Sequence, residues 1–537
     1  MKKRARLLSA VCLLIALVVS WLVPGDAGLA FAEDGLVCLQ ILAINDLHGH
    51  IEQTEYLDGR PVGGVAYLAT YMLEREADAV NTLRVHAGDM IGASPPISGL
   101  LQDQPTIEVL SFMGFDVGVP GNHEFDEGIA ELYRLQYGGF HEVSGYFAGS
   151  SFPLGLANLV SAETGGPVFP PYVVKVVEGV PVAFICVITE ELPASVTPAG
   201  IQGLKVIDPV EVINTYAEIV RDRGVEAIVV LAHEGGYVSS SGEIVGPIAK
   251  LAHGIDDSVD VIISAHTHQG YVGYIDGKLV TQAYSNGTAF VDIDLLIDRA
   301  TGDVVSSTAE LVTVWSDMRP PDPRIEALID RYRPLVEALV NRPVAVAATR
   351  LGREGRDQGE SVLGNLVADS KRWISKAQIA FVNPGGLRSD LEPGILTWGQ
   401  LYAVLPFGNE IVKIEMTGEQ ILSALNQQWQ ETEDGVQVRF LQMSGMTYCY
   451  DDSLPIGNRI VSASLSDGTQ IGDEQVYTVA VNSFLYYGGN GFTAFLEGRN
   501  PMVVANDLDA FVAYLESFAE PIALEIEGRI TRCLMKN

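Results

Sequence analysis

Five apolar stretches in the first half of the sequence end in the same way, with Asp, Asn or His shortly after the last apolar residue. Each stretch is rich in apolar and β-branched residues, as expected of a strand buried in a sheet. The polar ends lie at 45–50, 88–89, 121–126, 233–236 and 265–268, and they contain six of the 9 histidines of the chain. In an open α/β sheet the carboxyl ends of the strands meet at one edge, where binding sites form. The sequence therefore predicts one polar site assembled from all five ends.

These stretches alternate with segments whose apolar spacing suits helices. We expect strands at 37–44, 82–87, 115–119, 227–232 and 259–264, and helices at 65–79, 105–113 and 209–222. Strands that alternate with helices predict an α/β fold with a largely parallel sheet. The chain has 537 residues, which is too long for a single hydrophobic core, so we expect two domains.

The residue types at the five ends are those that bind metal ions. Along an extended chain, Asp46 and His48 would point the same way, which would place a carboxylate and an imidazole on one ion. The same spacing relates His266 to His268. Asp89 could donate one carboxylate oxygen to each of two ions. Any one of these motifs is compatible with an ordinary polar loop, but together they predict a site for two metal ions.

The segment 121–126, Gly-Asn-His-Glu-Phe-Asp, brings three useful groups into one turn. Asn122 offers a neutral amide oxygen to a divalent ion, and His123 can donate a proton. Asp126 can orient that imidazole and favour its charged form. We therefore expect this segment to lie in the active site.

As a set, these motifs resemble those of the calcineurin-like metallophosphoesterases, and 121–126 resembles the 5′-nucleotidase branch of that family. The resemblance implies two divalent ions. One ion would be held by Asp46, His48, Asp89 and His268, and the other by Asp89, Asn122, His233 and His266. Ligation by nitrogen and oxygen without thiolates suits Mn, Zn, Mg or Fe, and the sequence does not choose among them.

The resemblance also implies the chemistry. Two ions would bind the phosphate oxygens and lower the pKa of a coordinated water, which attacks the phosphorus. His123, oriented by Asp126, would stabilise the transferring phosphoryl group or protonate the leaving oxygen.

Three segments of the second half place an aromatic ring or an arginine beside flexible glycines. They lie at 383–388, 405–410 and 481–491, and together they resemble the 5′-nucleotidase C-terminal domain. The resemblance implies that Phe407 and Phe484 stack on the nucleobase. It also implies that Asn383 contacts the base, while Arg388 and an upstream arginine contact phosphate or ribose.

Two positions depart from the pattern. Arg356 is the expected upstream arginine. Its spacing to Glu360 departs from the pattern of the family, so Arg353 is the alternative. Many nucleotidases carry Asp where this chain has Asn490. An amide accepts and donates hydrogen bonds but carries no charge, so ribose recognition stays open.

The sequence divides into four expected segments. Residues 1–32 have the basic start, the apolar stretch and the Ala30-Phe31-Ala32 site of a signal peptide, with an uncleaved N-terminal anchor as the alternative. The resemblance implies a metallophosphoesterase domain at 33–318, built as a four-layer αββα sandwich, and a smaller α/β substrate-binding domain at 343–537. The linker at 319–342 follows from the prolines at 320–323 and from an amphipathic helix expected at 324–340. A surface excursion within one domain is the alternative.

Charge and cysteines bear on partners and location. The net charge of −34 disfavours nucleic-acid polymers and leaves a small nucleotide as the expected partner. The signal peptide predicts a secreted or cell-envelope protein without stable membrane insertion after cleavage. Export permits a disulfide, for which we expect Cys449 and Cys533.

We therefore expect a secreted phosphoric ester hydrolase, a 5′-nucleotidase that converts a nucleoside 5′-monophosphate into nucleoside and phosphate. The same metals would serve a 2′,3′-cyclic-nucleotide 2′-phosphodiesterase with 3′-nucleotidase activity, or a hydrolase of nucleoside diphosphates or UDP-sugars. A different class is an extracellular nucleotide-binding surface protein without catalysis. The sequence leaves the oligomeric state open.

Overall fold

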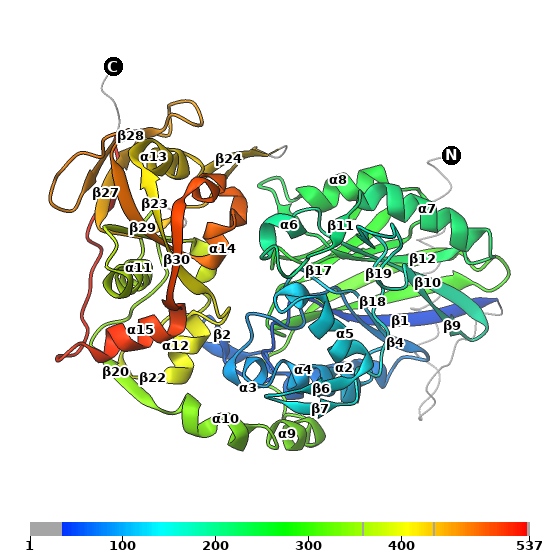
Figure 1. Cartoon of the computed structure of the whole chain (residues 1–537). Helices are drawn as coiled ribbons and strands as arrows, with labels where there is room; N and C mark the ends of the chain where they lie inside the picture. The colour runs from blue at the N-terminus through cyan, green and yellow to red at the C-terminus, as the bar shows by residue number, and fades with distance from the viewer. Residues whose placement is uncertain (1–34, 357–358, 433–434, 534–537) are drawn as a thin grey trace. The chain divides into compact units, whose positions relative to one another are not determined.

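A computed structural model describes residues 35–356, 359–432 and 435–533 (Figure 1), so the predicted signal peptide at 1–32 lies outside the described residues. The first sheet of the N-terminal half has the strand order β19-β18-β1-β4-β5. Its strands are β1 (Leu36–Ile44), β4 (Thr82–His86), β5 (Val117–Gly118), β18 (Ala289–Asp298) and β19 (Val304–Thr313). Strands β1, β4 and β5 run parallel, so their carboxyl ends lie at one edge.

The second sheet has the strand order β16-β17-β15-β12-β10-β9. Its strands are β9 (Tyr172–Val177), β10 (Val180–Ile188), β12 (Ala227–His233), β15 (Val261–Ile263), β16 (Gly270–Ile275) and β17 (Lys278–Ala283). Strands β10, β12, β15 and β17 run parallel. The predicted strands at 227–232 and 259–264 are therefore neighbours in this sheet.

Alternate residues of β10 belong to different cores. Val182 and Phe184 pack in the core that also holds the side chains of β1. Ala183 and Ile185 pack on the other face, against α7 (Pro209–Arg221) and α8 (Pro247–Gly254). Figure 1 shows α7 and α8 along one side of the two sheets, and α2 (Val65–Glu76) and α4 (Gln104–Met113) along the other. This is the four-layer αββα arrangement that the family resemblance implies.

The helices begin where their sequences predict. Helix α7 follows Asp208, whose side chain accepts a hydrogen bond from the backbone N–H of Val210 at 2.8 Å, and Pro209 occupies the first turn. Its apolar face packs on the second sheet through Val212, Ile213 and other residues. The carboxyl ends of the sheet strands are thereby held in fixed positions.

The single helix expected at 324–340 is wrong. The chain forms α9 (Pro323–Ile329) and then α10 (Arg333–Val340). Pro334 lies in the first turn of α10, where its ring disfavours the helical conformation of the preceding residue and prevents a hydrogen bond to the previous turn. Ile325, Leu328 and Ile329 of α9 pack into the core of the N-terminal half.

The C-terminal half is built on a sheet with the order β26-β21-β29-β23-β30. Its strands are β21 (Ile379–Val382), β23 (Glu410–Thr417), β26 (Gln442–Ser444), β29 (Val476–Asn482) and β30 (Arg499–Asn506). Helices α11 (Val362–Ser375) and α15 (Asp507–Glu516) contribute to the packing against it, and Lys371 of α11 forms a buried ion pair with Asp507. The mixed α/β fold class predicted for the chain is confirmed.

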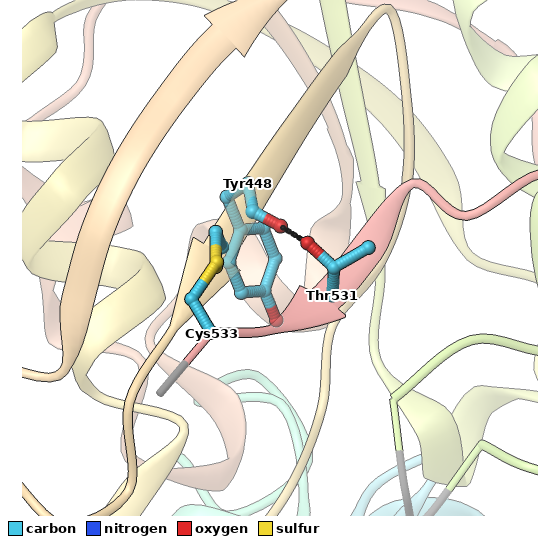
Figure 2. Close-up of a disulfide and its surroundings, with 4 residues drawn as sticks. Tyr448, Thr531 and Cys533 are labelled. Atoms are coloured by element: carbon cyan, nitrogen blue, oxygen red, sulfur yellow. Dashed lines mark hydrogen bonds between the residues drawn. A yellow bond between two sulfur atoms is a disulfide. The ribbon is translucent and has the colours of Figure 1, made fainter. Parts of the chain in front are cut away.

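A disulfide joins Cys449 to Cys533, whose Cα atoms are 5.8 Å apart, and this confirms the expected pair. Cys449 lies in β27 (Met446–Tyr450), which runs parallel to β31 (Ile530–Arg532). Figure 2 shows Cys533 directly after β31, where the hydroxyl of Thr531 donates to the carbonyl oxygen of Tyr448. The bond therefore ties the end of the described chain to the C-terminal half. Within the described ranges, no helix has the length and apolar character needed to cross a membrane.

Candidate functional site

The predicted ligands come from loops at the carboxyl ends of strands in both sheets. Asp46 and His48 follow β1, Asp89 follows β4, and Asn122 precedes the 3-10 turn η1 (His123–Phe125). His233 ends β12, while His266 and His268 follow β15. The structure brings all seven side chains together, and Asp46, His48, Asp89, Asn122 and His233 are almost completely buried.

The expectation that Asp46 and His48 lie on an extended chain is wrong, and so is the same expectation for His266 and His268. These residues and Asp89 adopt left-handed backbone conformations, with φ between 47° and 71°. Asp and His tolerate this region better than bulky apolar residues, and a residue held there costs about 1–3 kcal/mol. The side chains converge because each loop turns sharply after its strand.

Hydrogen bonds between the loops hold these turns. The N–H of Asp46 donates to the carbonyl oxygen of Gly88, and the N–H of His48 donates to that of Asp89, both at 2.9 Å. The N–H of His266 reaches the carboxylate of Asp46 at 3.0 Å. The first two loops of the first sheet are therefore joined directly, and the loop after β15 is attached to them.

Glycine is required where the loops approach most closely. A Cβ on Gly121 would lie 2.1 Å from Oδ1 of Asp89 and 2.5 Å from Cε1 of His233. A Cβ on Gly88 would lie 2.6 Å from the backbone nitrogen of Gly121. Any larger residue at 88 or 121 would separate the ligand side chains.

Two groups of donor atoms form, and both match the ligand sets implied by the resemblance. In the first, Nε2 of His48 lies 3.1 Å from Nε2 of His268, which lies 3.5 Å from Oδ1 of Asp46. The ligand atoms of these three residues lie within 4.8 Å of one another. They can face one cation.

In the second group, Nε2 of His233 lies 3.1 Å from Oδ1 of Asn122 and 3.3 Å from Oδ2 of Asp89. His266 completes a cluster with Asp89 and His233. Oδ2 of Asp89 also lies 3.8 Å from Nε2 of His48, in the first group. The same carboxylate therefore faces both groups, as a bridging ligand would.

The tautomers of the two buried imidazoles suit metal binding. Nδ1 of His48 lies 3.0 Å from the carbonyl oxygen of Gly92, and Nδ1 of His233 lies 2.9 Å from that of Ala87. A carbonyl only accepts, so Nδ1 carries the proton in each ring and Nε2 presents its lone pair to the other donor atoms. Lone pairs that face one another at 3.1 Å fit a cation between them.

The charge of the site also favours a cation. Burial lowers the pKa of His233, but the carboxylates of Asp89 and Asp46 outweigh it and raise the pKa to about 10. Burial raises the pKa of Asp89, yet His233 and His123 hold it well below its usual value. That raised pKa reflects the pull of the two carboxylates on a positive charge, and a metal ion on Nε2 would replace the proton there and supply the same charge. The donor set thus fits divalent metal ions, with no thiolate among its members.

His123 and Asp126 form the pair predicted from their spacing. Nδ1 of His123 lies 2.8 Å from Oδ2 of Asp126, and the backbone N–H of His123 donates to Oδ1 of Asp89 at 2.9 Å. Burial opposes the charged imidazole, but Asp126 and Asp89 raise the pKa of His123 above its ordinary value. His123 is therefore held beside the donor groups in a form suited to giving a proton.

Glu124, for which the motifs predict no role, positions two of the ligand loops. Its carboxylate accepts hydrogen bonds from the backbone N–H groups of Asp89, Met90 and Gly121, at 3.0, 2.8 and 2.6 Å. Glu124 thus joins the Asp89 loop to the loop that carries Asn122. Its place inside the segment 121–126 was a usable signal.

A pocket beside this site is lined by residues of both halves of the chain, which group into one unit from Val37 onward. Phe407 and Phe484 line it, and both rings are half-buried and outside the apolar cores. The ring of Phe407 stacks on that of His123, with centroids 5.7 Å apart and planes at 20°. The two aromatic side chains predicted to bind a base therefore line a pocket that Asn122 and His266 of the predicted metal site also line.

Of the polar side chains predicted to bind substrate, some line this pocket and one does not. Asn383, Arg388 and Asn490 line the pocket. The guanidinium of Arg388 lies 5.8 Å from the ring centroid of Phe407, and Asn383 accepts a hydrogen bond from Asn482 at 2.9 Å. Arg356 does not line the pocket.

Both candidate upstream arginines lie behind the loop that carries Arg388. Arg356 donates to the carbonyl oxygen of Leu387 at 3.0 Å, and Arg353 binds Asp390 and the carbonyl oxygen of Arg388 at 2.8 and 2.7 Å. Each supports the loop 384–388 through its backbone. Neither contributes to the pocket lining in this structure, so the choice between them stays a prediction.

Several pocket residues were missed from the sequence. They are Glu191, Thr197, Asn409, Arg439 and Asn482. Asn409 follows Phe407 by two residues and was within reach of a motif argument. Glu191 and Arg439 come from segments without any chemical motif, and only the fold brings them to the pocket.

Comparison with known proteins agrees with this geometry. Residues 39–270 match the calcineurin-like phosphoesterase family, and residues 343–497 match the 5′-nucleotidase C-terminal domain. Endonuclease YhcR of Bacillus subtilis (strain 168) is 40% identical over 505 residues, 92% of this chain and 41% of that protein. Cell wall protein Lmo0130 of Listeria monocytogenes serovar 1/2a is 35% identical over 572 residues, 97% of this chain and 72% of that protein.

Among solved structures, a 5′-nucleotidase precursor from Thermus thermophilus matches with a TM-score of 0.79 at 28% identity, over 93% of this chain and all of that one. The fold and its donor groups define a phosphoric ester hydrolase of the metallophosphoesterase class, which implies divalent metal ions. The chain belongs to the 5′-nucleotidase family, with a calcineurin-like phosphoesterase domain followed by a 5′-nucleotidase C-terminal domain. It spans less than half the length of the endonuclease relative.

Proposed function

We propose that this protein is a secreted or cell-envelope 5′-nucleotidase that hydrolyses nucleoside 5′-monophosphates to nucleoside and phosphate. One observation carries the proposal: the ring of Phe407 stacks on His123, which lies beside the donor groups of Asp89 and Asn122. A surface for a flat base therefore adjoins groups that suit phosphate chemistry. We assign the domains as 33–318 and 343–537, joined by 319–342.

Each residue has a proposed role. Asp46, His48, Asp89, Asn122, His233, His266 and His268 would hold two divalent ions. When bound, such ions hold phosphate oxygens, activate water and offset developing negative charge. Arg388 binds the phosphate or the ribose, while Phe407, Phe484 and Asn383 bind the base, and Asn490 faces the sugar. His123 gives its Nε2 proton to the leaving 5′ oxygen, and Asp126 keeps the proton on Nδ1.

Location outside the cytoplasm is supported by three observations. Residues 1–32 have the pattern of a signal peptide. The Cys449–Cys533 disulfide is typical of an oxidising compartment. One relative is named a cell wall protein.

The decisive test is phosphate release from AMP by the full chain, before and after treatment with a chelator and then with Mn²⁺, Zn²⁺ or Mg²⁺ added back. We expect activity that the chelator removes and a metal restores. Phe407→Ala should mainly raise KM, while His123→Ala should mainly lower kcat. Hydrolysis of 2′,3′-cyclic AMP or UDP-glucose in preference to AMP would replace this proposal with the corresponding esterase or diphosphate hydrolase.

A further inference from the structure

A second guanidinium lines the pocket, and its surroundings differ from those of Arg388. Arg388 lies over Phe407 at the end of the pocket that holds His123. Arg439 follows β25 (Gly435–Val438), and its Nη1 donates to Oε1 of Gln430 at 3.0 Å. Nε2 of Gln430 donates to the carbonyl oxygen of Asn490 at 2.7 Å. Gln430 therefore links Arg439 to the backbone of Asn490, which lines the same pocket.

Among the described contacts, the charge of Arg439 has one long ion pair and no hydrogen-bonded carboxylate. Its nearest carboxylate oxygen is Oε2 of Glu191, 4.0 Å from Nη2, which is beyond hydrogen-bond distance. The Arg439 side chain is only 20% exposed, whereas that of Glu191 is 50% exposed and remains hydrated. A mostly buried guanidinium whose one ion pair is long and not hydrogen-bonded is only partly compensated, and an anionic ligand could compensate it further.

The lining of the pocket contains more neutral amides than carboxylates. Asn409, Asn482 and Asn490 line the same pocket, and Gln430 binds both Arg439 and Asn490. A planar guanidinium among amide donors suits phosphate oxygens, which accept several hydrogen bonds at once. Two arginines in one pocket, one over Phe407 and the other joined to Asn490 through Gln430, suit a ligand with two negatively charged groups.

We propose that the pocket accepts a nucleoside 5′-phosphate with a second phosphate on the 2′ or 3′ oxygen of its ribose, and that Arg439 selects for this second phosphate. The inference rests on the proposed function and deepens it. Water attacks the 5′ phosphorus, the bond from phosphorus to the 5′ oxygen breaks, and His123 protonates that oxygen. The products are inorganic phosphate and a nucleoside 2′- or 3′-phosphate.

Glu191 provides an internal check on this assignment. If Arg439 binds a phosphate, the nearby carboxylate of Glu191 repels the same phosphate, so removal of the two charges has opposite effects. If the two side chains instead form only an ion pair between segments of the fold, removal of either charge breaks that pair. Both substitutions would then act in the same direction, and on every substrate.

The experiment compares kcat/KM of the full chain, with its divalent metal, for adenosine 3′,5′-bisphosphate, adenosine 2′,5′-bisphosphate and AMP. The quantity of interest is kcat/KM for a bisphosphate divided by kcat/KM for AMP. We expect Arg439→Gln to lower that ratio about tenfold or more, and Glu191→Gln to raise it about twofold to fivefold. Arg459→Gln is the matched control, because Arg459 lies over the ring of Trp429 and does not line the pocket.

Each outcome decides a separate point. If Arg439→Gln lowers the ratio for only one of the two bisphosphates, that bisphosphate shows whether the second phosphate is carried by the 2′ or the 3′ oxygen of the ribose. If AMP is hydrolysed but the ratio is insensitive to Arg439→Gln, or moves the same way in both variants, the second phosphate site is refuted and the nucleotidase stands. If no nucleotide is hydrolysed, the proposed function fails. Calorimetric binding of adenosine 3′,5′- and 2′,5′-bisphosphate to wild type and Arg439→Gln then decides the phosphate site, since equal affinities would refute it.

Discussion

The contact between His123 and Asp126 makes a graded prediction for catalysis. Nδ1 of His123 and Oδ2 of Asp126 are 2.8 Å apart, and both side chains are partly shielded from water. Asp126→Asn keeps an oxygen that can accept from Nδ1 but removes the charge. Asp126→Ala removes the acceptor as well. The two variants therefore separate the hydrogen bond from the charge that assists it.

The expected losses follow from the strength of such bonds. A hydrogen bond to a charged group contributes about 1.5–3 kcal/mol, roughly twice the value of a neutral one. Loss of the charge alone should cost about 1 kcal/mol, or about fivefold in kcat, since about 1.4 kcal/mol is tenfold. Loss of the whole bond should cost about tenfold to 150-fold.

The pH profile supplies a second readout. Asp126 raises the pKa of His123, and the protonated imidazole is the form that can donate to the leaving oxygen. The rate therefore falls as pH rises through that pKa. Without the charge of Asp126 the pKa drops, so the alkaline limb of the kcat profile should move to lower pH in both variants.

The assay is phosphate release from saturating AMP across a pH series. Glu127→Gln is the matched control. It removes the exposed carboxylate of the residue next to Asp126, and that carboxylate makes no hydrogen bond to His123 among the described contacts. An equal shift of the alkaline limb in Glu127→Gln and Asp126→Asn would show that only the general field matters. An unchanged kcat in Asp126→Ala would refute the role of the pair.

Two further predictions concern the scaffold. Gly121→Ala should weaken metal binding by about fivefold to 150-fold, because the new Cβ overlaps Asp89 and His233 and such overpacking costs about 1–3 kcal/mol. Calorimetric metal titration measures this, and Gly166→Ala, whose nearest atom would be 3.6 Å away, should match wild type. Replacement of Cys449 and Cys533 by Ser should lower the free energy of unfolding by about 4–5 kcal/mol, as expected for a cross-link over 84 residues. Urea unfolding measures the loss, and equal stability would show that the disulfide constrains little.

The positions of several strands along the chain and the gathering of polar groups at their ends could be predicted, because an apolar run and the polar residues after it are visible in the local sequence. An apolar run such as 227–232 indicates a buried strand, and His233 directly after it falls at the edge where parallel strands end. The left-handed turns could not be predicted. Asp46, His48 and Asp89 adopt them because hydrogen bonds from neighbouring loops hold them there. Such bonds link residues that are far apart in sequence.

The pocket lined by Phe407, Arg388 and Arg439 also shows where prediction from local sequence ends. Phe407 and Arg388 were recognised because each lies in a motif with glycines. Arg439 was not, because nothing near it in sequence distinguishes it from a surface arginine. Its proposed role depends on Gln430 and Glu191, which approach it only in the folded chain. A functional residue that acts through its surroundings leaves no local pattern.

The bonds between the ligand loops have a consequence for how the site works. Asp46 and His48 are attached to the loop of Asp89 through backbone hydrogen bonds, and Glu124 attaches that loop to Gly121. The donor atoms are therefore held in position by the protein itself, and not only by an ion. A site arranged in this way spends little binding energy on ordering its ligands, so more of that energy is available to stabilise charge on the phosphate. The strained turns at Asp46, His48 and Asp89 are the cost of this arrangement, and the large cores of the two sheets offset it.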